Sequence, residues 1–466
     1  MIELEPDVLQ TLSRILGGER LLTARADLEA YAWDNTGPKY LPQAVALAET
    51  REEVAAVLST CQRARIPVVP RGAGTGNVGG SLPVRGGIVL STQRMNRILE
   101  IQPADRLAVV EPGVINADLQ QALAPTGLFW PPDPSSAKSC SVGGNLAMCA
   151  AGPNAPRFGV TRDWVLGLTA VLMDGSLLRT GGRTTKGVVG YDLTRLLVGS
   201  EGTLAVIVEA TLKLAPRPAE RRLLRACFAS VEEAARAVTR LMGEGESPSA
   251  VEFIDAGCLD LLRQANASTL PEAARALLLV EVSGESGMAT WQAERVLERL
   301  QALNPLETAT AGVEEAGRIW SARFALSPLL KKLAPRRINE DVVVPVSHLA
   351  ELVTGVEEIA ARRGIPIVCF GHAGNGNLHV NLLVDPADAK QMSRVDPALG
   401  DLFRLTLALQ GSLSGEHGVG LQKSPFIAWE LDPVSLALQQ RLKALFDPLG
   451  LLNPGKIFPA DSPRLV

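Results

Sequence analysis

The sequence predicts an α+β protein with more than one domain. Its 466 residues exceed the length of a single small domain, for which about 150 residues is a working figure. Near the start, a strand at 44–48, a helix begun by Thr50 and Glu53 and a strand at 66–69 form an α/β opening. After the proline-rich stretch 215–219, apolar strands again alternate with amphipathic helices. The two regions are therefore expected to build separate cores.

Charge and cysteine content restrict the function. Lys and Arg number 46 against 50 Asp and Glu, a net charge of −4, so the overall charge does not favour nucleic acid or an acidic membrane. The six cysteines form no Cys-x-x-Cys pair, which indicates reduced thiols and excludes an iron–sulfur centre on this chain. Without a signal-peptide pattern or an apolar run near ~18 residues, we expect a cytoplasmic protein, at most peripheral at the inner membrane face.

A glycine-rich loop follows the second strand. Gly74, Gly76 and Gly79 match the G-x-G-x-x-G spacing, but the residues after them, Ser-Leu-Pro-Val-Arg, cannot form the helix that this dinucleotide fingerprint requires. Residues without side chains still expose backbone N–H groups that hold a phosphate. An anion cradle therefore explains the loop better than a turn that binds nothing.

The next region is rich in strands and in small residues. Strands are expected at 98–101, 107–110, 166–173, 177–179 and 203–214, with a hairpin turn at Asp174-Gly175. Between them, the stretches 131–145, 151–154 and 158–161 consist largely of small residues. Such stretches let the backbone pass close to a large flat ligand. By themselves they indicate a nucleotide or cofactor loop.

The region after 215–219 has the alternation of a ferredoxin-like α+β sheet. Its expected elements are strands at 223–228, 277–282, 338–344 and 365–370, a helix begun by Ser230 and Glu233, and a helix at 312–332 that carries Arg323. This second domain is expected to cover the ligand of the first.

Three of the four histidines lie in two glycine-rich motifs, His372 and His379 in one and His417 in the other. Neighbouring glycines let the first motif fold sharply enough for both imidazoles to converge. With Glu416, they form the donor set of a catalytic divalent-metal site, for which Zn²⁺ is the default. The same spacing also suits hydrogen-bonding loop histidines without a metal. His417 cannot easily point the same way as Glu416, which leaves it available as an acid or base.

Three motifs in order, Pro70–Gly76, Ser139–Asn145 and Gly190–Leu204, resemble the FAD-binding domain of the vanillyl-alcohol-oxidase-type flavoproteins. The resemblance implies a two-lobed FAD-binding domain. It also implies non-covalent FAD, because the first loop lacks the histidine to which some relatives attach the cofactor. The FAD contacts that it implies are Arg71, Gly72, Ala73, Gly74, Thr75, Gly76, Asn77, Pro132, Ser136, Ser139, Gly143, Gly144, Asn145, Gly152, Gly159, Glu201, Gly202, Ile207 and Asn453.

Both histidine motifs resemble those of the FAD-dependent D-2-hydroxyacid dehydrogenases. The resemblance to this family extends over nearly the whole chain. This family includes the flavin-binding subunit of glycolate oxidase, D-lactate dehydrogenase and D-2-hydroxyglutarate dehydrogenase. The resemblance implies the following roles: His372, His379 and Glu416 as metal ligands, His417 as catalytic base, Asn381 as a substrate contact and Arg323 as the clamp on the substrate carboxylate. The planar guanidinium of an arginine suits such a clamp because it pairs with a carboxylate through two hydrogen bonds.

Two further substrate positions bear on specificity. Ser327 and Asn339 lie where the hydroxyglutarate enzymes have a threonine and a lysine. The absence of the lysine charge favours a monoacid, glycolate or D-lactate. The implied reaction is metal-assisted oxidation to the 2-oxo acid, with the hydroxyl proton passing to His417 and a hydride to flavin N5. Electrons would then leave for a partner or a quinone, and the resemblance is compatible with FAD-containing and iron–sulfur partner subunits and with a homodimer.

Other functions remain open at this point. D-2-Hydroxyglutarate is an alternative substrate. The alkyl-dihydroxyacetone-phosphate synthases share the FAD domain, but they would need a basic phosphate pocket, for which Lys331, Lys332, Arg336 and Arg337 are the candidates. A non-catalytic FAD-binding electron-transfer subunit is a third alternative, against which the acid/base and metal-ligating residues argue.

The expected domain limits are 1–215 for the FAD-binding domain and 216–420 for the substrate-binding cap with its metal site. The remainder, 421–466, is expected to be a helical return. By resemblance, its turn at 450–458 folds back onto the FAD-binding domain.

Overall fold

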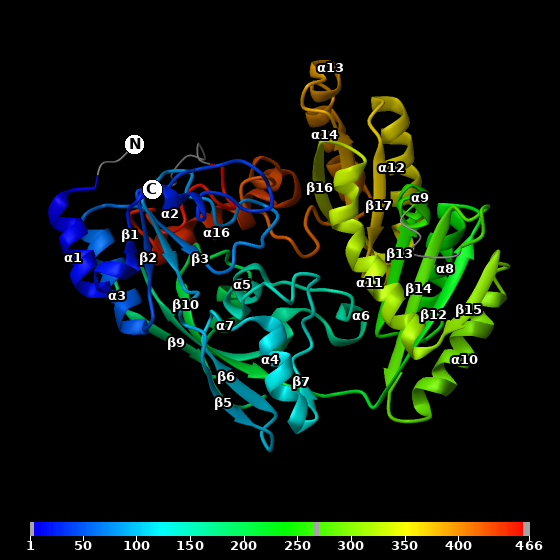
Figure 1. Cartoon of the computed structure of the whole chain (residues 1–466), viewed down its shortest axis with the longest axis horizontal. Coiled ribbons are helices and arrows are strands. Elements are labelled where there is room, and N and C mark those ends of the chain that lie inside the picture. The colour runs from blue at the N-terminus through cyan, green and yellow to red at the C-terminus, as the bar shows by residue number, and fades with distance from the viewer. Residues whose placement is uncertain (1–3, 265–269, 460–466) are drawn as a thin grey trace. The chain divides into compact units, whose positions relative to one another are not determined.

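The computed structural model describes residues 4–264 and 270–459 (Figure 1). The chain forms two compact units. The first comprises Met1–Ala151, Val160–Arg217 and Glu416–Val466, and the second comprises Gly152–Gly159 and Pro218–Gly415. The chain thus enters the second unit at Pro218 and returns to the first at Glu416, ahead of the expected limit at 420. The short segment 152–159, expected within the FAD-binding domain, groups with the second unit.

The α/β opening forms the first sheet of the first unit. Its strand order is β1 (Leu21–Leu22), β2 (Ala44–Leu47), β4 (Ile88–Ser91) and β3 (Val68–Arg71), and the last three are parallel. Helix α3 (Arg51–Arg63) connects β2 with β3 and begins at Thr50, whose side chain accepts a hydrogen bond from the Glu53 N–H, as predicted. The strand expected at 66–69 starts later, because the Ile66 N–H still bonds to the Cys61 carbonyl at the helix end.

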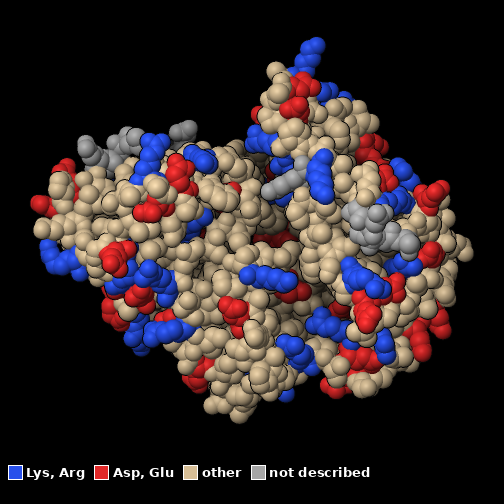
Figure 2. Space-filling model, viewed as in Figure 1, with Lys and Arg blue, Asp and Glu red and all other residues tan. Residues whose placement is uncertain are grey.

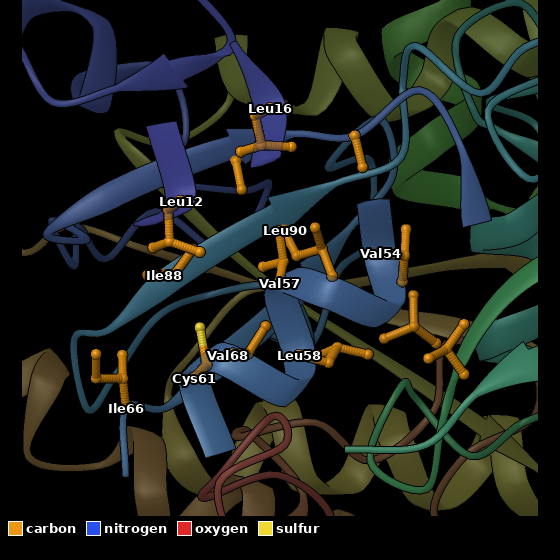
Figure 3. Close-up of a cluster of buried hydrophobic side chains, with 14 of the residues drawn as sticks. Leu12, Leu16, Val54, Val57, Leu58, Cys61, Ile66, Val68, Ile88 and Leu90 are labelled. Atoms are coloured by element: carbon orange, nitrogen blue, oxygen red, sulfur yellow. The ribbon is translucent and has the colours of Figure 1, made fainter. Parts of the chain in front are cut away.

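An apolar core holds this sheet in place (Figure 3). Leu12 and Leu16 of α1 (Pro6–Leu16) pack with Val57 and Leu58 of α3 and with Ile88 of β4, and none of the five is exposed. Full burial of such a side chain stabilises the fold by about 1.5–3 kcal/mol. The core therefore fixes the end of β3, where the glycine-rich loop begins.

The strand-rich region forms an antiparallel sheet in the same unit. Its order is β5 (Ile98–Gln102), β6 (Leu107–Val110), β10 (Val206–Lys213), β8 (Val165–Val171) and β9 (Leu177–Gly181). The expected strands are thus present, and the predicted hairpin turn at Asp174-Gly175 connects β8 with β9. Other elements of this unit are α2 (Arg25–Glu29), α4 (Asn116–Leu123), α5 (Val142–Met148), α7 (Leu193–Leu197), and the pair β7 (Leu128–Phe129) and β11 (Ala215–Pro216).

The C-terminal segment packs onto this unit. After α15 (Ile427–Glu430) and α16 (Pro433–Phe446), Leu452 forms a parallel bridge with Val68 of β3. The side-chain amide of Asn453 donates to the carbonyls of Gly80 (2.9 Å) and Glu201 (2.7 Å). The turn at 450–458 therefore supports strand β3 and the glycine-rich loop that follows this strand.

The second unit contains one large antiparallel sheet. Its order is β15 (Glu307–Ala311), β12 (Glu220–Phe228), β14 (Ala276–Gly284), β13 (Ala250–Asp255), β17 (Ile367–Gly371), β18 (Asn377–Val384) and β16 (Arg336–Val343). The first four strands have the neighbour order of a ferredoxin-like fold, with α8 (Val231–Gly243) and α10 (Met288–Gln301) in the crossovers. The predicted sheet is thus present, and β17, β18 and β16 extend it.

The remaining helices of the second unit are α6 (Ala155–Phe158), α9 (Ala256–Gln264), α11 (Val313–Leu329), α12 (Leu349–Arg363), α13 (Ala389–Met392) and α14 (Val395–Ala408). Helix α8 begins at Ser230, whose side chain accepts from the Glu233 N–H, as predicted. The helix expected at 312–332 ends at Leu329, because Pro328 lies in its last turn and a 3₁₀ turn follows.

The distribution of surface charge and the character of the helices agree with the near-balanced charge and the lack of long apolar runs in the sequence. On the face shown in Figure 2, acidic and basic side chains are interspersed over both units. Within residues 4–264 and 270–459, helices that combine the length and apolar character needed to cross a bilayer are absent.

Asp255, at the end of β13, provides a test of the packing in the second unit. Burial raises the pKa of Asp255 to about 6, although its carboxylate accepts hydrogen bonds from the backbone N–H groups of Cys258 and Cys369. The folded protein thus binds a proton that the unfolded chain releases near pH 4. We expect this group to lower the free energy of unfolding by about 2 kcal/mol as the pH rises from 4 to 6. Urea unfolding at both pH values should show this loss in the wild type relative to Asp255→Asn, and equal pH dependence would contradict the assignment.

Candidate functional site

The glycine-rich loop of the first unit is braced by Arg71. The guanidinium of this buried side chain donates to Ser81 Oγ (3.1 Å) and to the Trp33 carbonyl (2.9 Å). Burial lowers the pKa of Arg71. Arg71 therefore supports the loop from inside, and Gly72–Asn77 form its partly exposed rim.

Three glycines of the loop have different reasons to lack a side chain. A Cβ on Gly72 would lie 2.3 Å from Ser141 Oγ, and Gly74 has a φ of +70°. Around Gly76, by contrast, the described residues place nothing within 4 Å of a Cβ. Packing and backbone conformation therefore explain Gly72 and Gly74. Gly76 faces open space, as a residue in a ligand cradle would.

The loop meets the second motif at a pocket. Ser141 begins helix α5 and accepts a hydrogen bond from the Gly144 N–H (3.2 Å). A pocket of about 470 Å³ is lined by Ala73, Gln93, Asn96, Ile98, Gly113, Val114, Ile115, Asp118, Ser139 and Ser141. The fold thus brings together Ala73 and Ser139, two of the predicted FAD contacts, at a volume that suits part of a dinucleotide.

Other predicted FAD contacts are buried in the protein. These are Pro132, Asn145, Glu201, Gly202, Ile207 and Asn453. Asn145 Oδ1 accepts from Asn116 Nδ2 (3.1 Å), and the Asn453 amide bonds to backbone carbonyls. Gly143 packs against Pro112, and the Ser136 carbonyl accepts from Ser139 Oγ. Gly152 and Gly159 belong to the second unit. Most of these residues therefore shape the loops that carry the pocket.

Glu201 anchors the motif that contains His417. Its carboxylate accepts hydrogen bonds from the N–H groups of Val419 (2.7 Å) and Gly420 (2.8 Å). Burial raises the pKa of Glu201, although these two hydrogen bonds act to lower it. His417 Nε2 lies 3.2 Å from Asn77 Nδ2. When the amide N–H₂ group donates in this contact, Nε2 carries no proton, and that is the form of the ring that can accept one.

The second unit presents polar side chains on one face of its sheet. Strands β16 and β18 place Asn339 opposite Asn381 and Asp341 opposite His379. Directly opposed residues and residues two apart on a strand share a face. The predicted common face of His379 and Asn381 is therefore present, and both side chains are buried.

The two histidines of the first motif converge as predicted. His372 follows β17, and the 3₁₀ turn Ala373–Asn375 with Gly376 (φ +73°) leads the chain back into β18. The rings of His372 and His379 lie edge to face, with centroids 5.3 Å apart.

A residue that the sequence analysis missed, Glu252, joins these groups. Its carboxylate is fully buried on β13. Oε1 lies 2.5 Å from His372 Nδ1, and Oε2 lies 2.6 Å from Arg323 Nε and 2.5 Å from Nη2. Burial raises the pKa of Glu252, but the charge of Arg323 and the hydrogen bonds from His372 and Arg323 outweigh this and hold the pKa below its usual range. A single acidic residue in the apolar segment 250–254 was the available signal.

Asp341 was also missed. Its Oδ1 lies 3.8 Å from His379 Nδ1 and accepts from Asn377 Nδ2 (2.6 Å). His372 Nδ1 thus has a carboxylate at hydrogen-bonding distance, whereas the Asp341 carboxylate lies beyond hydrogen-bonding distance of His379 Nδ1. Histidines that bind metals through Nε2 characteristically have such a carboxylate at the other nitrogen. The donor set of the second unit therefore fits a divalent metal.

Arg323 has one hydrogen-bonding edge committed to the protein. Glu252 occupies its Nε and Nη2, and the guanidinium carbon lies 4.6 Å from the centroid of the Phe370 ring. Its other edge, Nη1 with Nη2, points away from Glu252 because the fork is rigid and planar. Asn381 donates to the backbone carbonyls of Val368 and His379, and its Oδ1 has no hydrogen-bond partner among the described residues.

Ser327 lies one helical turn after Arg323 and contacts a second cation. Ser327 Oγ accepts from Arg337 Nη1 (2.6 Å). Burial lowers the pKa of Arg337, and among the described residues it forms no ion pair. Of the other candidates for a basic pocket, Lys332 and Arg336 are exposed, and the side chain of Lys331 lies outside the described residues.

Comparison with known proteins decides the family. A model described as "FAD linked oxidases, C-terminal domain" matches residues 217–457, and one described as "FAD binding domain" matches 42–181. Glycolate oxidase subunit GlcD of Bacillus subtilis (strain 168) is 39% identical over 99% of this chain and 98% of that protein. D-lactate dehydrogenase of Anaerostipes hadrus is 33% identical over 90% of each. The chain belongs to the FAD-linked D-2-hydroxyacid dehydrogenase family.

As a member of this family, the protein is an FAD-dependent oxidoreductase, which confirms the predicted cofactor. The fold agrees. p-Cresol methylhydroxylase with bound substrate superimposes with a TM-score of 0.82 at 18% identity, over 98% of this chain and 97% of the other. An alkyldihydroxyacetonephosphate synthase gives 0.76 at 18%, over 97% and 86%. The vanillyl-alcohol-oxidase type of this α+β dehydrogenase is therefore confirmed.

Gly76 provides a test of the FAD cradle in this dehydrogenase. Because its Cβ would meet nothing in the protein and its φ is ordinary, Gly76→Ala should not change stability. A methyl group against a phosphate would cost about 1–3 kcal/mol, so we expect FAD to bind on the order of tenfold more weakly. Titration of the apoprotein with FAD by flavin fluorescence measures this. Gly18→Ala, in the same unit, where a Cβ would make only an ordinary contact with Ser13 Oγ at 3.8 Å, is the control, and equal affinities of all three proteins would exclude this loop from the cradle.

Proposed function

We propose that this enzyme oxidises a small D-2-hydroxy acid, glycolate or D-lactate, to the corresponding 2-oxo acid. The observation that supports it most is the buried group in which Glu252 holds Arg323 and His372, with His379 beside His372 and Asn381 on the same face as His379. It combines a cation shaped for a carboxylate with imidazoles arranged as metal ligands. The names of the relatives, glycolate oxidase subunit GlcD and D-lactate dehydrogenase, agree with such a substrate.

Substrate binding follows from two side chains of the second unit. The remaining edge of Arg323 can donate two parallel hydrogen bonds to the carboxylate, which fixes the orientation of the acid. Asn381 Oδ1 can accept from the 2-hydroxyl group. Because both side chains are buried, these hydrogen bonds form away from bulk water, where they are stronger.

We further propose a divalent metal, with Zn²⁺ as the default, on His372, His379 and Glu416. When bound, such an ion polarises the 2-hydroxyl group and makes its proton easier to remove. The Glu252 carboxylate at Nδ1 of His372 supports this assignment. Gly415, directly before Glu416, has no room for a Cβ, which would lie 2.1 Å from Asn377 Nδ2 and 3.1 Å from Asp341 Oδ1.

His417 is the proposed base. Its contact with Asn77 favours the ring form with an unprotonated Nε2, and Glu201 holds the turn at 419–420 that follows it. His417 would take the hydroxyl proton, and the chemistry that non-covalently bound FAD would supply is acceptance of a hydride from C2.

For the later fate of the electrons, we propose a partner protein or a quinone. The six cysteines are all free and buried, and their thiols are not arranged as the ligands of an iron–sulfur centre. A cytoplasmic location, with peripheral contact at the inner membrane face, suits such a partner. A second, FAD-containing subunit or a homodimer is compatible with this scheme.

Arg337 favours a second candidate substrate, a D-2-hydroxy diacid such as D-2-hydroxyglutarate. It lies two residues before Asn339 on β16 and hence on the same face of the sheet. A largely desolvated cation without an ion pair is costly unless an anion completes it. Arg337 could therefore provide the charge that Asn339 lacks.

A panel of acids separates the two candidates. Anaerobic flavin bleaching with glycolate, D- and L-lactate, D-2-hydroxyglutarate and D-malate should be fastest with glycolate or D-lactate. Arg337→Met should then leave the KM for that monoacid unchanged, as should the control Arg336→Met at the exposed neighbour. Fastest bleaching by a diacid, with a KM that Arg337→Met raises on the order of tenfold, would instead establish the second candidate. A flavin that none of these acids bleaches would reject both.

The base has its own test. His417→Ala should retain FAD and metal, because Arg71 braces the glycine-rich loop from inside and Glu252 holds His372. Flavin reduction in stopped flow should slow by roughly 10²–10⁴-fold, the usual contribution of a general base. His348→Ala, at the exposed start of α12, serves as the matched control. An unchanged reduction rate in His417→Ala would remove His417 as the base.

A further inference from the structure

We propose that Glu252 is a positioning residue that orients a metal ligand, His372, and the substrate clamp, Arg323, through one shared carboxylate. The proposal rests on the function proposed above and adds to it a physical link between its metal and substrate sites. Glu252 itself touches neither substrate nor metal in this scheme.

Each oxygen of the carboxylate has a different partner. Oε1 lies 2.5 Å from His372 Nδ1, whereas Oε2 lies 2.6 Å from Arg323 Nε. A carboxylate oxygen accepts hydrogen bonds, so the short contact with Nδ1 requires a proton on that nitrogen. The proton of a neutral His372 is thereby assigned to Nδ1. Its Nε2 is left with the lone pair that a metal needs.

The same carboxylate decides which edge of Arg323 is used. Nε donates a hydrogen bond to Oε2, and Nη2 lies 2.5 Å from the same oxygen, so the guanidinium cannot rotate without breaking a charge-assisted hydrogen bond and an ion pair. The Phe370 ring lies against the guanidinium, 4.6 Å away. The free edge therefore has a fixed direction, and rigid positioning of this kind is what bidentate recognition of a carboxylate requires.

The environment makes the link rigid. Glu252 has no solvent-exposed surface, and Arg323 is 3% and His372 2% exposed. Water cannot replace a lost partner there, and an uncompensated buried charge is costly. Movement of His372 and movement of Arg323 are therefore coupled through the one side chain that both require.

Replacement by glutamine distinguishes this role from ordinary packing. An amide has one acceptor oxygen and one N–H₂ group, so Glu252→Gln can accept from His372 or from Arg323 but not from both. Glu252→Asp keeps the charge but is one methylene shorter and cannot reach both partners. Both variants should lose metal affinity and substrate affinity together.

Glu281 provides the matched control. It is a buried glutamate on the neighbouring strand β14, and its carboxylate accepts from Arg221 (3.0 Å) and from the Trp320 indole N–H (3.0 Å). Glu281→Gln therefore removes a comparable buried charge in the same sheet without touching His372 or Arg323.

The measurement is Zn²⁺ affinity of the purified flavoprotein, determined by competition with a chelator and without substrate. We expect Glu252→Gln and Glu252→Asp to bind Zn²⁺ roughly 10- to 100-fold more weakly than the wild type, as loss of a carboxylate behind a metal-binding histidine usually does. The KM for the best acid of the panel should rise in both. Glu281→Gln should retain wild-type Zn²⁺ affinity and KM.

The possible outcomes distinguish failure of this inference from failure of the proposed function on which it rests. A wild type that binds no Zn²⁺ would overturn the metal assignment and this inference together. Zn²⁺ affinity that is unchanged in the Glu252 variants, or reduced equally in Glu281→Gln, would overturn the inference alone. Should both Glu252 variants fail to fold, ¹⁵N NMR of histidine in the wild-type flavoprotein decides. A proton on His372 Nδ1 supports the inference, and a proton on Nε2 with Nδ1 bare overturns it.

Discussion

The second unit depends on a carboxylate that is buried without access to water. Glu252 retains a charge there because Arg323 and His372 both bond to it, and the pKa of the group lies below its usual range for that reason. The sheet supplies the geometry. Register between β13, β17 and β18 places Glu252, His372 and His379 close together, so the polar group exists only when these strands are correctly paired.

In the first unit, the main structural requirement is that the backbone of one loop can pass close to a ligand. Its loop combines glycines that packing requires, such as Gly72 against Ser141, with Gly76, which meets nothing in the protein. The buried carboxylate of Glu201 then holds the turn that follows His417. Glu201 and Glu252 thus have parallel roles, since each is a buried acid that orders a segment carrying a histidine.

Similar folds perform different reactions in this group of proteins, as the likeness to p-cresol methylhydroxylase and to an alkyldihydroxyacetonephosphate synthase shows. Specificity must therefore come from side chains on the shared frame. Here the face between α11 and the sheet carries Arg323 and, one helical turn further along, Ser327 with Arg337. The length and charge of the acid are expected to be decided between these two cations.

Much of the fold and of the site follows from the sequence alone. Local signals such as the Thr50 and Ser230 caps and the glycine-rich loop predicted elements that are present, because capping and turn formation depend on neighbours in the chain. The family and FAD as cofactor came from the resemblance of several motifs to known flavoproteins, whereas the convergence of His372 and His379 followed from the glycines of one local loop.

The tertiary structure decided the rest. Glu252 and Asp341 were missed because a lone acidic residue in a strand has no meaning until strand pairing shows what lies opposite it. In the sequence Arg337 is one of a cluster of basic residues, and only its contact with Ser327 separates it from its exposed neighbours. Partners of buried charges lie far away in the sequence, and only packing reveals which ones they are.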